Sequence, residues 1–165
     1  MSEENKTALL SLAGLSQSKV AKSEETIAAL NRSYRSAIKV RHGIDGTSIR
    51  KIQSELGREV TATFLAEKIA SACEFFNVVQ NITDQQIIEV IGLLMGEYSH
   101  LTVEDISVMF RRAKTNGPGY EKPMSRIDGA LIMRWVNQYM ADKYDQIEQD
   151  QALQSMSHKT DPIAP

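Results

Sequence analysis

The sequence Ser125-Arg-Ile-Asp-Gly-Ala-Leu-Ile-Met-Arg-Trp-Val-Asn-Gln-Tyr139 contains the only tryptophan of the chain and its widest apolar face. On a helical period of 3.6 residues, its apolar side chains fall into two adjoining rows. The first row is Ile127, Leu131, Trp135 and Tyr139, and the second is Ile132, Val136, Met140 and Tyr144. A stripe two rows wide is typical of a helix in a groove between other helices. We therefore predict a central core helix, with Ser125 as its cap and Asp128 in its first turn.

Two helix starts with the same capping pattern precede this one. Thr83 is followed three residues later by Gln86, and Thr102 by Asp105. Each pair has the spacing of a capping box, in which the two side chains bond the free amides of the first turn. The turn at residues 99–101 is short, which favours antiparallel neighbours. The sequence therefore predicts a C-terminal three-helix unit over residues 83–146.

Upstream of residue 83 the apolar spacing predicts three further helices. The first begins after Ser23 and ends at the turn residues His42-Gly43, and a short helix covers residues 47–56. The third begins at Thr61 and runs for about five turns. The side chains expected to be buried in the first are Ile27, Leu30, Tyr34, Ala37 and Ile38, and those in the third are Phe64, Leu65, Ile69, Ala72, Cys73, Phe76 and Val79.

The ends of the chain lack this periodicity. Residues 1–22 combine a short leucine pattern with a Ser-Gln-Ser-Lys linker, and residues 147–165 are polar and acidic. We predict a flexible N-terminal segment over 1–22, a helical domain over 23–146 and a disordered tail over 147–165. The expected fold is all-α, a single helical bundle of about five or six helices with flexible termini.

Composition excludes several classes of function. The single cysteine, Cys73, excludes an internal disulfide and a cysteine-based zinc site. The three histidines have no partners at metal or catalytic spacing, and no glycine loop follows a strand. No apolar run reaches the roughly 18 residues of a membrane span, and the acidic start does not resemble a signal peptide. We expect a cytoplasmic protein that is not an enzyme and that carries no cofactor or metal.

The candidate binding site is a basic loop that contains two glycines. Five basic residues and a tyrosine lie around Gly117 and Gly119, with one acid among them. The candidate residues are Arg111, Arg112, Lys114, Tyr120, Lys122 and Arg126. Arginine recognises phosphate and carboxylate, and an exposed tyrosine stacks on bases, so this loop fits single-stranded DNA or an acidic protein patch. In the alternative interpretation the arginines complement the end of their helix, Gly117 terminates it, and Tyr120 packs on the core.

A second basic set lies in the N-terminal part of the chain. Its members are Arg32, Arg35, Lys39, Arg41, Arg50, Lys51 and Arg58. The set extends a nucleic-acid surface if it shares a face with the loop, and is a solvated exterior if it is spread around the helices.

Residues 60–145 carry a resemblance. The pattern comprises Ile82-Thr-Asp, Ile87, Tyr98-Ser-His-Leu-Thr102, Asp105, Phe110-Arg-Arg-Ala-Lys114, Gly119-Tyr120, Arg126-Ile-Asp-Gly129, Ile132 and Trp135-Val-Asn-Gln-Tyr139. It resembles a family of small uncharacterised helical proteins of phages and mobile elements of gut bacteria, which has no assigned catalytic residues to carry over. More loosely, the layout is similar to that of phage replicative-helicase loaders.

The resemblance implies a non-enzymatic helical adaptor in phage or mobile-element DNA replication, which binds a replication protein, DNA, or both. The alternative is a structural or host-inhibiting phage protein that acts only through protein contacts. A small hydrolase or nuclease is disfavoured, because the sequence shows no acid cluster and no histidine pair.

Overall fold

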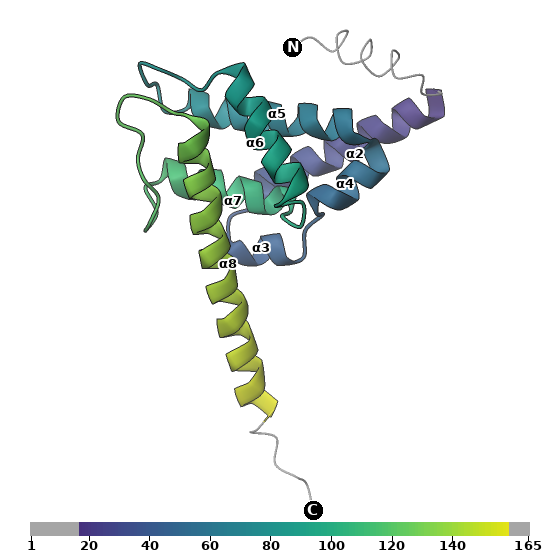
Figure 1. The fold of residues 1–165 in the computed structure, drawn as a ribbon. Helices are drawn as coiled ribbons and strands as arrows, with labels where there is room; N and C mark the ends of the chain where they lie inside the picture. Colours follow the sequence, from purple (N-terminus) through teal and green to yellow (C-terminus); the bar gives the residue numbers. More distant parts are fainter. Residues whose placement is uncertain (1–16, 159–165) are drawn as a thin grey trace, which may run out of the picture. The chain divides into compact units, whose positions relative to one another are not determined.

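The computed structural model describes residues 17–158, and these form seven helices and no strand. The predicted all-α helical fold is confirmed (Figure 1). In chain order the helices are α2 (Gln17–Ser36), α3 (Val40–Ile44), α4 (Ile49–Leu56), α5 (Arg58–Glu74), α6 (Asp84–Gly96), α7 (Val103–Lys114) and α8 (Gly129–His158). The chain divides into two compact units between Ser36 and Ala37, so the predicted limit at residue 22 does not coincide with this boundary. The predictions for residues 1–16 and 159–165 lie outside the described residues.

The break after α2 differs from the prediction. Ile38 was expected on the buried face, but it is 58% exposed, and His42 and Gly43 lie inside α3 instead of ending a helix. The backbone amides of Ile38 and Lys39 donate to His42 Nδ1 at 3.0 and 3.3 Å. The imidazole therefore bonds free amides at the start of α3, and His42 helps to begin a helix.

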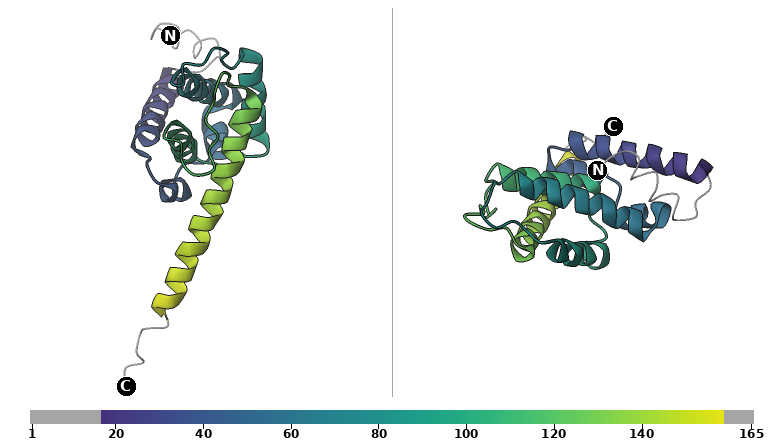
Figure 2. Two further views of the ribbon diagram at one scale, coloured as in Figure 1. Left: turned by 90° about the vertical axis from the view of Figure 1, so that its left-hand side faces the viewer. Right: turned by 90° about the horizontal axis from the view of Figure 1, so that it is seen from above.

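The most enclosed element of the second unit is α7. Every residue from Leu101 to Phe110 is buried, so this helix is surrounded on all sides. Helices α3 and α8 both pack against it, while α5 packs on α4 and α6 (Figures 1 and 2). The predicted central helix, α8, is thus one wall of the core, and α7 is its centre.

The first half of α8 packs as its apolar rows predict. The row from Ile127 to Tyr139 is buried throughout. The second row is buried at Ile132 and Val136, but Met140 is only half-buried and Tyr144 is exposed. The core therefore covers about the first three turns of α8 and leaves the rest of the helix at the surface.

Two of the three predicted caps are confirmed. Thr83 with Gln86 and Thr102 with Asp105 form capping boxes at the starts of α6 and α7. At α8 the cap is Asp128, whose carboxylate accepts from the backbone N–H of Leu131 at 2.9 Å, and the prediction of Ser125 is wrong. The carbonyl of Ser125 instead accepts from the backbone N–H of Gln80 at 3.1 Å, which holds that segment outside the helix.

Helix α5 is shorter than its apolar spacing indicates. It ends at Glu74, and Asn77 takes a left-handed conformation with φ 45°. Val79, which was expected to be buried, is 96% exposed. Phe64, Leu65 and Cys73 are buried as predicted.

The buried thiol of Cys73 gives a first testable expectation. Burial raises the pKa of Cys73 from its ordinary value near 9 to about 11, with Lys114 opposing the shift. At a pH near 8 a shift of this size lowers the reactive thiolate fraction by about 100-fold. We expect labelling by an aromatic disulfide reagent to be at least about 100-fold slower in the native protein than in guanidinium chloride. Equal rates in the two conditions would contradict the burial.

The same shift has a consequence for stability. Because the pKa of Cys73 is higher in the folded state, its contribution to stability is present below pH 9 and is lost as the pH rises through about 11.

The second half of α8 corrects the predicted tail. The helix continues to His158, whereas disorder was predicted from residue 147. Residues 130–158 contain no glycine or proline to stop it, and Asp150 is held by Arg41 of α3 at 3.4 Å and by Gln146 at 3.1 Å. The helix therefore extends past α3 (Figure 1). None of the helices within residues 17–158 is both long and apolar enough to cross a bilayer.

Candidate functional site

Tyr120 and Arg112, two of the predicted binding residues, form contacts within the protein. Tyr120 is only 6% exposed, and its hydroxyl donates to Asp142 Oδ2 at 3.1 Å. Arg112 pairs with the same carboxylate, and Gln138 donates to its other oxygen at 3.0 Å. Burial, followed by the charge of Asp142, raises the pKa of Tyr120. The predicted stacking role of Tyr120 is therefore wrong, and the alternative interpretation of this residue is correct.

The other four predicted residues lie at or near the surface. Arg111, Lys122 and Arg126 are exposed, and Arg126 is paired with Asp128 of the α8 cap at 3.3 Å. Lys114 is half-buried with its Nζ atom 5.1 Å from the centre of the Phe75 ring, and burial lowers the pKa of Lys114. This arrangement is a cation–π contact.

The glycines of the loop were expected to shape a binding site, but Gly119 has a role in the backbone conformation of the loop. Gly119 has φ 78°, and a Cβ atom there would lie 2.4 Å from the Gln138 side chain. The positive φ favours glycine at this position, whereas the Gln138 side chain is flexible and can move away from a Cβ atom. At the end of α7, Asn116 with φ 52°, not Gly117, takes the left-handed conformation.

A chain of aromatic rings links the core to this surface. Phe110 meets Trp135 edge-on at 6.4 Å, Trp135 lies 5.5 Å from Phe76, and Phe76 meets Phe75 edge-on at 5.3 Å. Phe75 is 60% exposed and was not singled out in the sequence. The signal was nonetheless present, because successive helical residues diverge by about 100° and Phe76 was already assigned to the buried face.

Two loops lie side by side at this end of the unit, where α8 begins (Figure 1). They are residues 75–83, between α5 and α6, and residues 115–128, between α7 and α8. Gln80 joins them, because its N–H donates to Ser125 at 3.1 Å and its carbonyl accepts from Ile127 at 2.9 Å. The indole Nε1 of Trp135 donates to the carbonyl of Glu121 at 2.9 Å, which ties the second loop to α8.

These two hydrogen-bonded loops carry solvent-exposed apolar side chains. Val79 and Met124, which lie next to the paired segments, are each 96% exposed. We define the paired-loop surface by three apolar and four basic residues, namely Phe75, Val79, Met124, Arg111, Lys114, Lys122 and Arg126. Exposed apolar side chains on two joined, ordered loops that also carry exposed cations make this region a candidate interaction surface.

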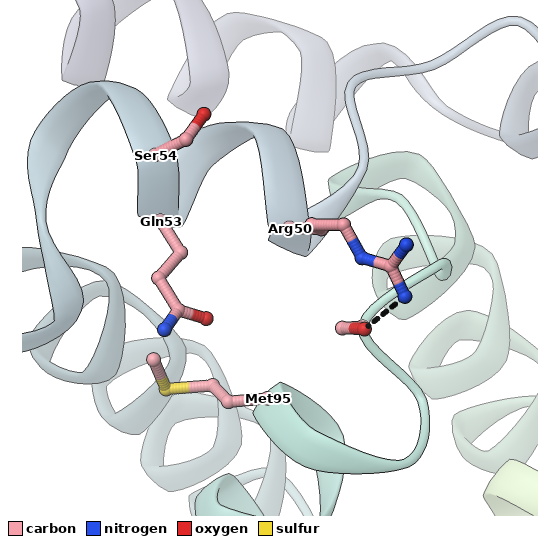
Figure 3. A pocket seen from close by; sticks show the side chains of 5 residues that line it. Arg50, Gln53, Ser54 and Met95 are labelled. Carbon is pink, nitrogen blue, oxygen red and sulfur yellow. Dashed lines mark hydrogen bonds between the residues drawn. The ribbon is translucent and has the colours of Figure 1, made fainter.

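A hollow of about 380 Å³ lies between α4 and the end of α6 (Figure 3). Its lining comprises Arg50, Gln53, Ser54, Met95 and Ser99. Arg50 donates to Ser99 Oγ at 3.3 Å, and Ser54 Oγ donates to the carbonyl of Lys51 at 2.7 Å. Arg50, Ser54 and Ser99 therefore already have partners within the protein.

The most deeply buried polar cluster is centred on Asp105, which is fully buried. Its carboxylate accepts from the Tyr139 hydroxyl at 2.6 Å, from Lys143 Nζ at 2.6 Å and from the Thr102 amide at 2.8 Å. The Gly43 carbonyl accepts from Thr102 Oγ1 at 3.2 Å and from Lys143 at 3.3 Å. Burial, followed by the charge of Asp105, raises the pKa of Tyr139. The cluster joins α3, α7 and α8, and its bonds are directed within the protein, which is typical of a structural role.

Gly43 permits this close packing. A Cβ atom at this position would lie 1.7 Å from Asp105 Oδ1, so no other residue fits without a shift of the cluster.

The second basic set is spread over separate elements. Arg32 and Arg35 belong to α2, Arg41 to α3, and the pair Arg50-Lys51 to α4, with the remaining members at the starts of α3 and α5. Within residues 17–158 no group of three or more histidine, cysteine or acidic side chains is placed to hold a metal ion.

Comparison of the chain with models of known protein families, with curated proteins and with solved structures found no match.

Proposed function

We propose that this protein is a non-enzymatic adaptor that binds a partner protein. The segment of the partner that it binds is acidic and carries apolar side chains. The paired-loop surface is the docking site. The observation that carries the proposal is the exposure of Val79 and Met124, each 96%, on segments that Gln80 holds together. Because the backbone of these segments is already ordered, a partner that covers them does not have to order it.

The composition of the surface favours protein over nucleic acid. Single-stranded nucleic acid is bound by a basic groove with aromatic platforms, whereas two of the three apolar residues here are aliphatic. Tyr120 is buried, and Lys114 occupies one side of the Phe75 ring. The remaining cations fit carboxylates on a partner and would steer its approach.

The resemblance noted in the sequence points to a replication protein of a phage or mobile element as that partner. The non-enzymatic role is supported by the polar clusters around Asp105 and Asp142, whose oxygens form hydrogen bonds within the protein. If the captured partner were a capsid, tail or host-defence protein, the structural or host-inhibiting alternative would replace the replication role.

Site-specific photo-crosslinking tests the proposal. We expect a photoreactive amino acid at Val79 or Met124, introduced in cells that make the protein, to yield one discrete crosslinked protein. The same residue at Ile88, an exposed apolar position on α6, should yield none. The yield should fall at least about fivefold when Lys122 and Arg126 are both changed to glutamate, because rim charges govern association.

Two results would contradict the proposal. One is equal crosslinking at Val79 and Ile88, which would show that partner proteins do not bind the paired-loop surface in preference to other exposed apolar positions. The other is salt-dependent binding of oligothymidylate by the purified protein that the K122E/R126E variant abolishes, which would assign the surface to nucleic acid.

A further inference from the structure

The distal part of α8 has the chemistry of the segment that the paired-loop surface is proposed to accept. Asp145, Glu148 and Met156 are exposed and follow one another at spacings of three and eight residues, which places them on one face of the helix. Leu153 and Met156 are 66% and 67% exposed. The distal part of α8 therefore carries exposed acids at residues 145 and 148, followed by exposed apolar side chains at residues 153 and 156.

The last part of this segment is exposed. The ion pair between Arg41 and Asp150, at 3.4 Å, holds α8 against α3. Beyond it, residues 151–156 are all exposed. An exposed helical end that carries acidic and apolar side chains is suited to dock on a complementary surface.

The segment cannot reach the paired-loop surface of its own chain. α8 begins beside that surface and runs away from it as one continuous helix (Figures 1 and 2). At a rise of about 1.5 Å per residue, Leu153 lies roughly 36 Å along the helix from Gly129. The contact must therefore be made with another molecule.

Charge complementarity indicates which surface of the second molecule the distal part of α8 contacts. Parallel pairing of two α8 ends would bring Asp145 and Glu148 of one copy against the same acids of the other, and like charges repel. Lys122 and Arg126 of the paired-loop surface are cations beside exposed Met124. The two cations complement the acids of the distal helix, and Met124 complements its apolar side chains.

We infer that residues 145–156 of one copy dock on the paired-loop surface of a second copy. The inference rests on the proposed function, and it names a second copy of this chain as an occupant of that same surface. The contact is head-to-tail, so each molecule keeps a free surface at one end and a free helix end at the other, and association produces rings or open chains. A foreign partner must displace the second copy, which makes self-association a regulator of docking.

Sedimentation velocity of the full-length chain over a range of concentrations tests the inference. We expect wild-type protein to form species larger than the monomer, and the association to weaken with added salt. The variant D145K/E148K and the variant K122E/R126E should each weaken self-association by at least about tenfold, since each reverses one side of the contact. The control is K51E/R58E, which makes the same change of charge as K122E/R126E on exposed residues of α4 and α5. It should behave as wild type.

The decisive step is to mix the two reversed variants. The lysines of D145K/E148K then face the glutamates of K122E/R126E, and association should return in the mixture although each variant alone is weakened. Circular dichroism confirms that each variant is folded.

Three results would overturn the inference. They are a monomeric wild type, variants that associate like wild type, and a mixture that does not recover. If a foreign protein still crosslinks at Val79 and Met124, only the self-association fails. If those positions capture nothing, the proposed function fails as well.

Discussion

Replacement of Trp135 by alanine is expected to lower the free energy of unfolding by about 3–5 kcal/mol. The side chain is buried between Phe110 and Phe76, and its Nε1 donates to the carbonyl of Glu121. The substitution removes two aromatic contacts, opens a cavity and leaves a carbonyl of the α7–α8 loop without its donor. A loss of this size is a large part of the roughly 5–15 kcal/mol that stabilises a typical domain.

Urea unfolding followed by circular dichroism measures this loss. Trp135→Phe keeps a ring in the core but removes the donor to Glu121, so its expected loss is smaller, about 1–2 kcal/mol. Arg134→Ala is the surface control, because it removes only the exposed ion pair with Glu121 at 2.9 Å and should cost less than about 1 kcal/mol. Trp135→Ala with a loss as small as that of Arg134→Ala would mean that this face of α8 is not part of the core.

Trp135→Ala should also loosen the paired-loop surface, since the indole ties the second loop to α8. A weaker crosslink at Met124 in a variant that remains folded would connect the core to the docking site.

Features set by nearby residues were predictable from the sequence. The capping boxes at Thr83 and Thr102 involve side chains three residues apart, and the buried row of α8 follows from the helical period alone. Such features need no knowledge of the rest of the fold. The all-α fold class followed from the same periodicity.

The errors arose where a distant residue takes part. Ser125 has the chemistry of a helix cap, but its carbonyl is used by Gln80 in another loop. Val79 continues an apolar spacing, but α5 ends before it, at Glu74, and the next residue, Gln80, is bonded to Ser125 of the other loop. The predicted tail is helical to His158, and its contact between Asp150 and Arg41 of α3 has no signal in the local sequence.

The candidate site was predicted in part for the same reason. Its location in the α7–α8 loop and its exposed cations follow from local composition. The orientation of Tyr120 depends on Asp142, which lies 22 residues further along the chain, and such a pairing has no signal in a single sequence. The partner loop, with Phe75 and Val79, comes from a different part of the chain and is brought in by tertiary packing.

Replacement of Lys143 by methionine is expected to cost about 3–5 kcal/mol, because it leaves the Asp105 carboxylate buried without its cation. The ammonium group lies 2.6 Å from Asp105 Oδ2, and the two side chains are 12% and 0% exposed. Tyr139 and the Thr102 amide still donate to the carboxylate, but neither carries a charge that offsets its burial. The matched control is Lys122→Met, the same chemical change at an exposed position, which should shift stability by no more than about 0.5 kcal/mol.

A second substitution separates the lost cation from lost packing. In Asp105→Asn with Lys143→Met, the amide keeps the shape of the carboxylate without its charge. Its oxygen can accept from the Thr102 amide while its NH₂ group donates to the Tyr139 hydroxyl oxygen. We therefore expect the double variant to be more stable than Lys143→Met alone by at least about 1 kcal/mol, which urea unfolding resolves. If the losses of the two single variants simply added, the charges of Asp105 and Lys143 would be independent, and the ion pair could not be what joins α7 to α8 at this point.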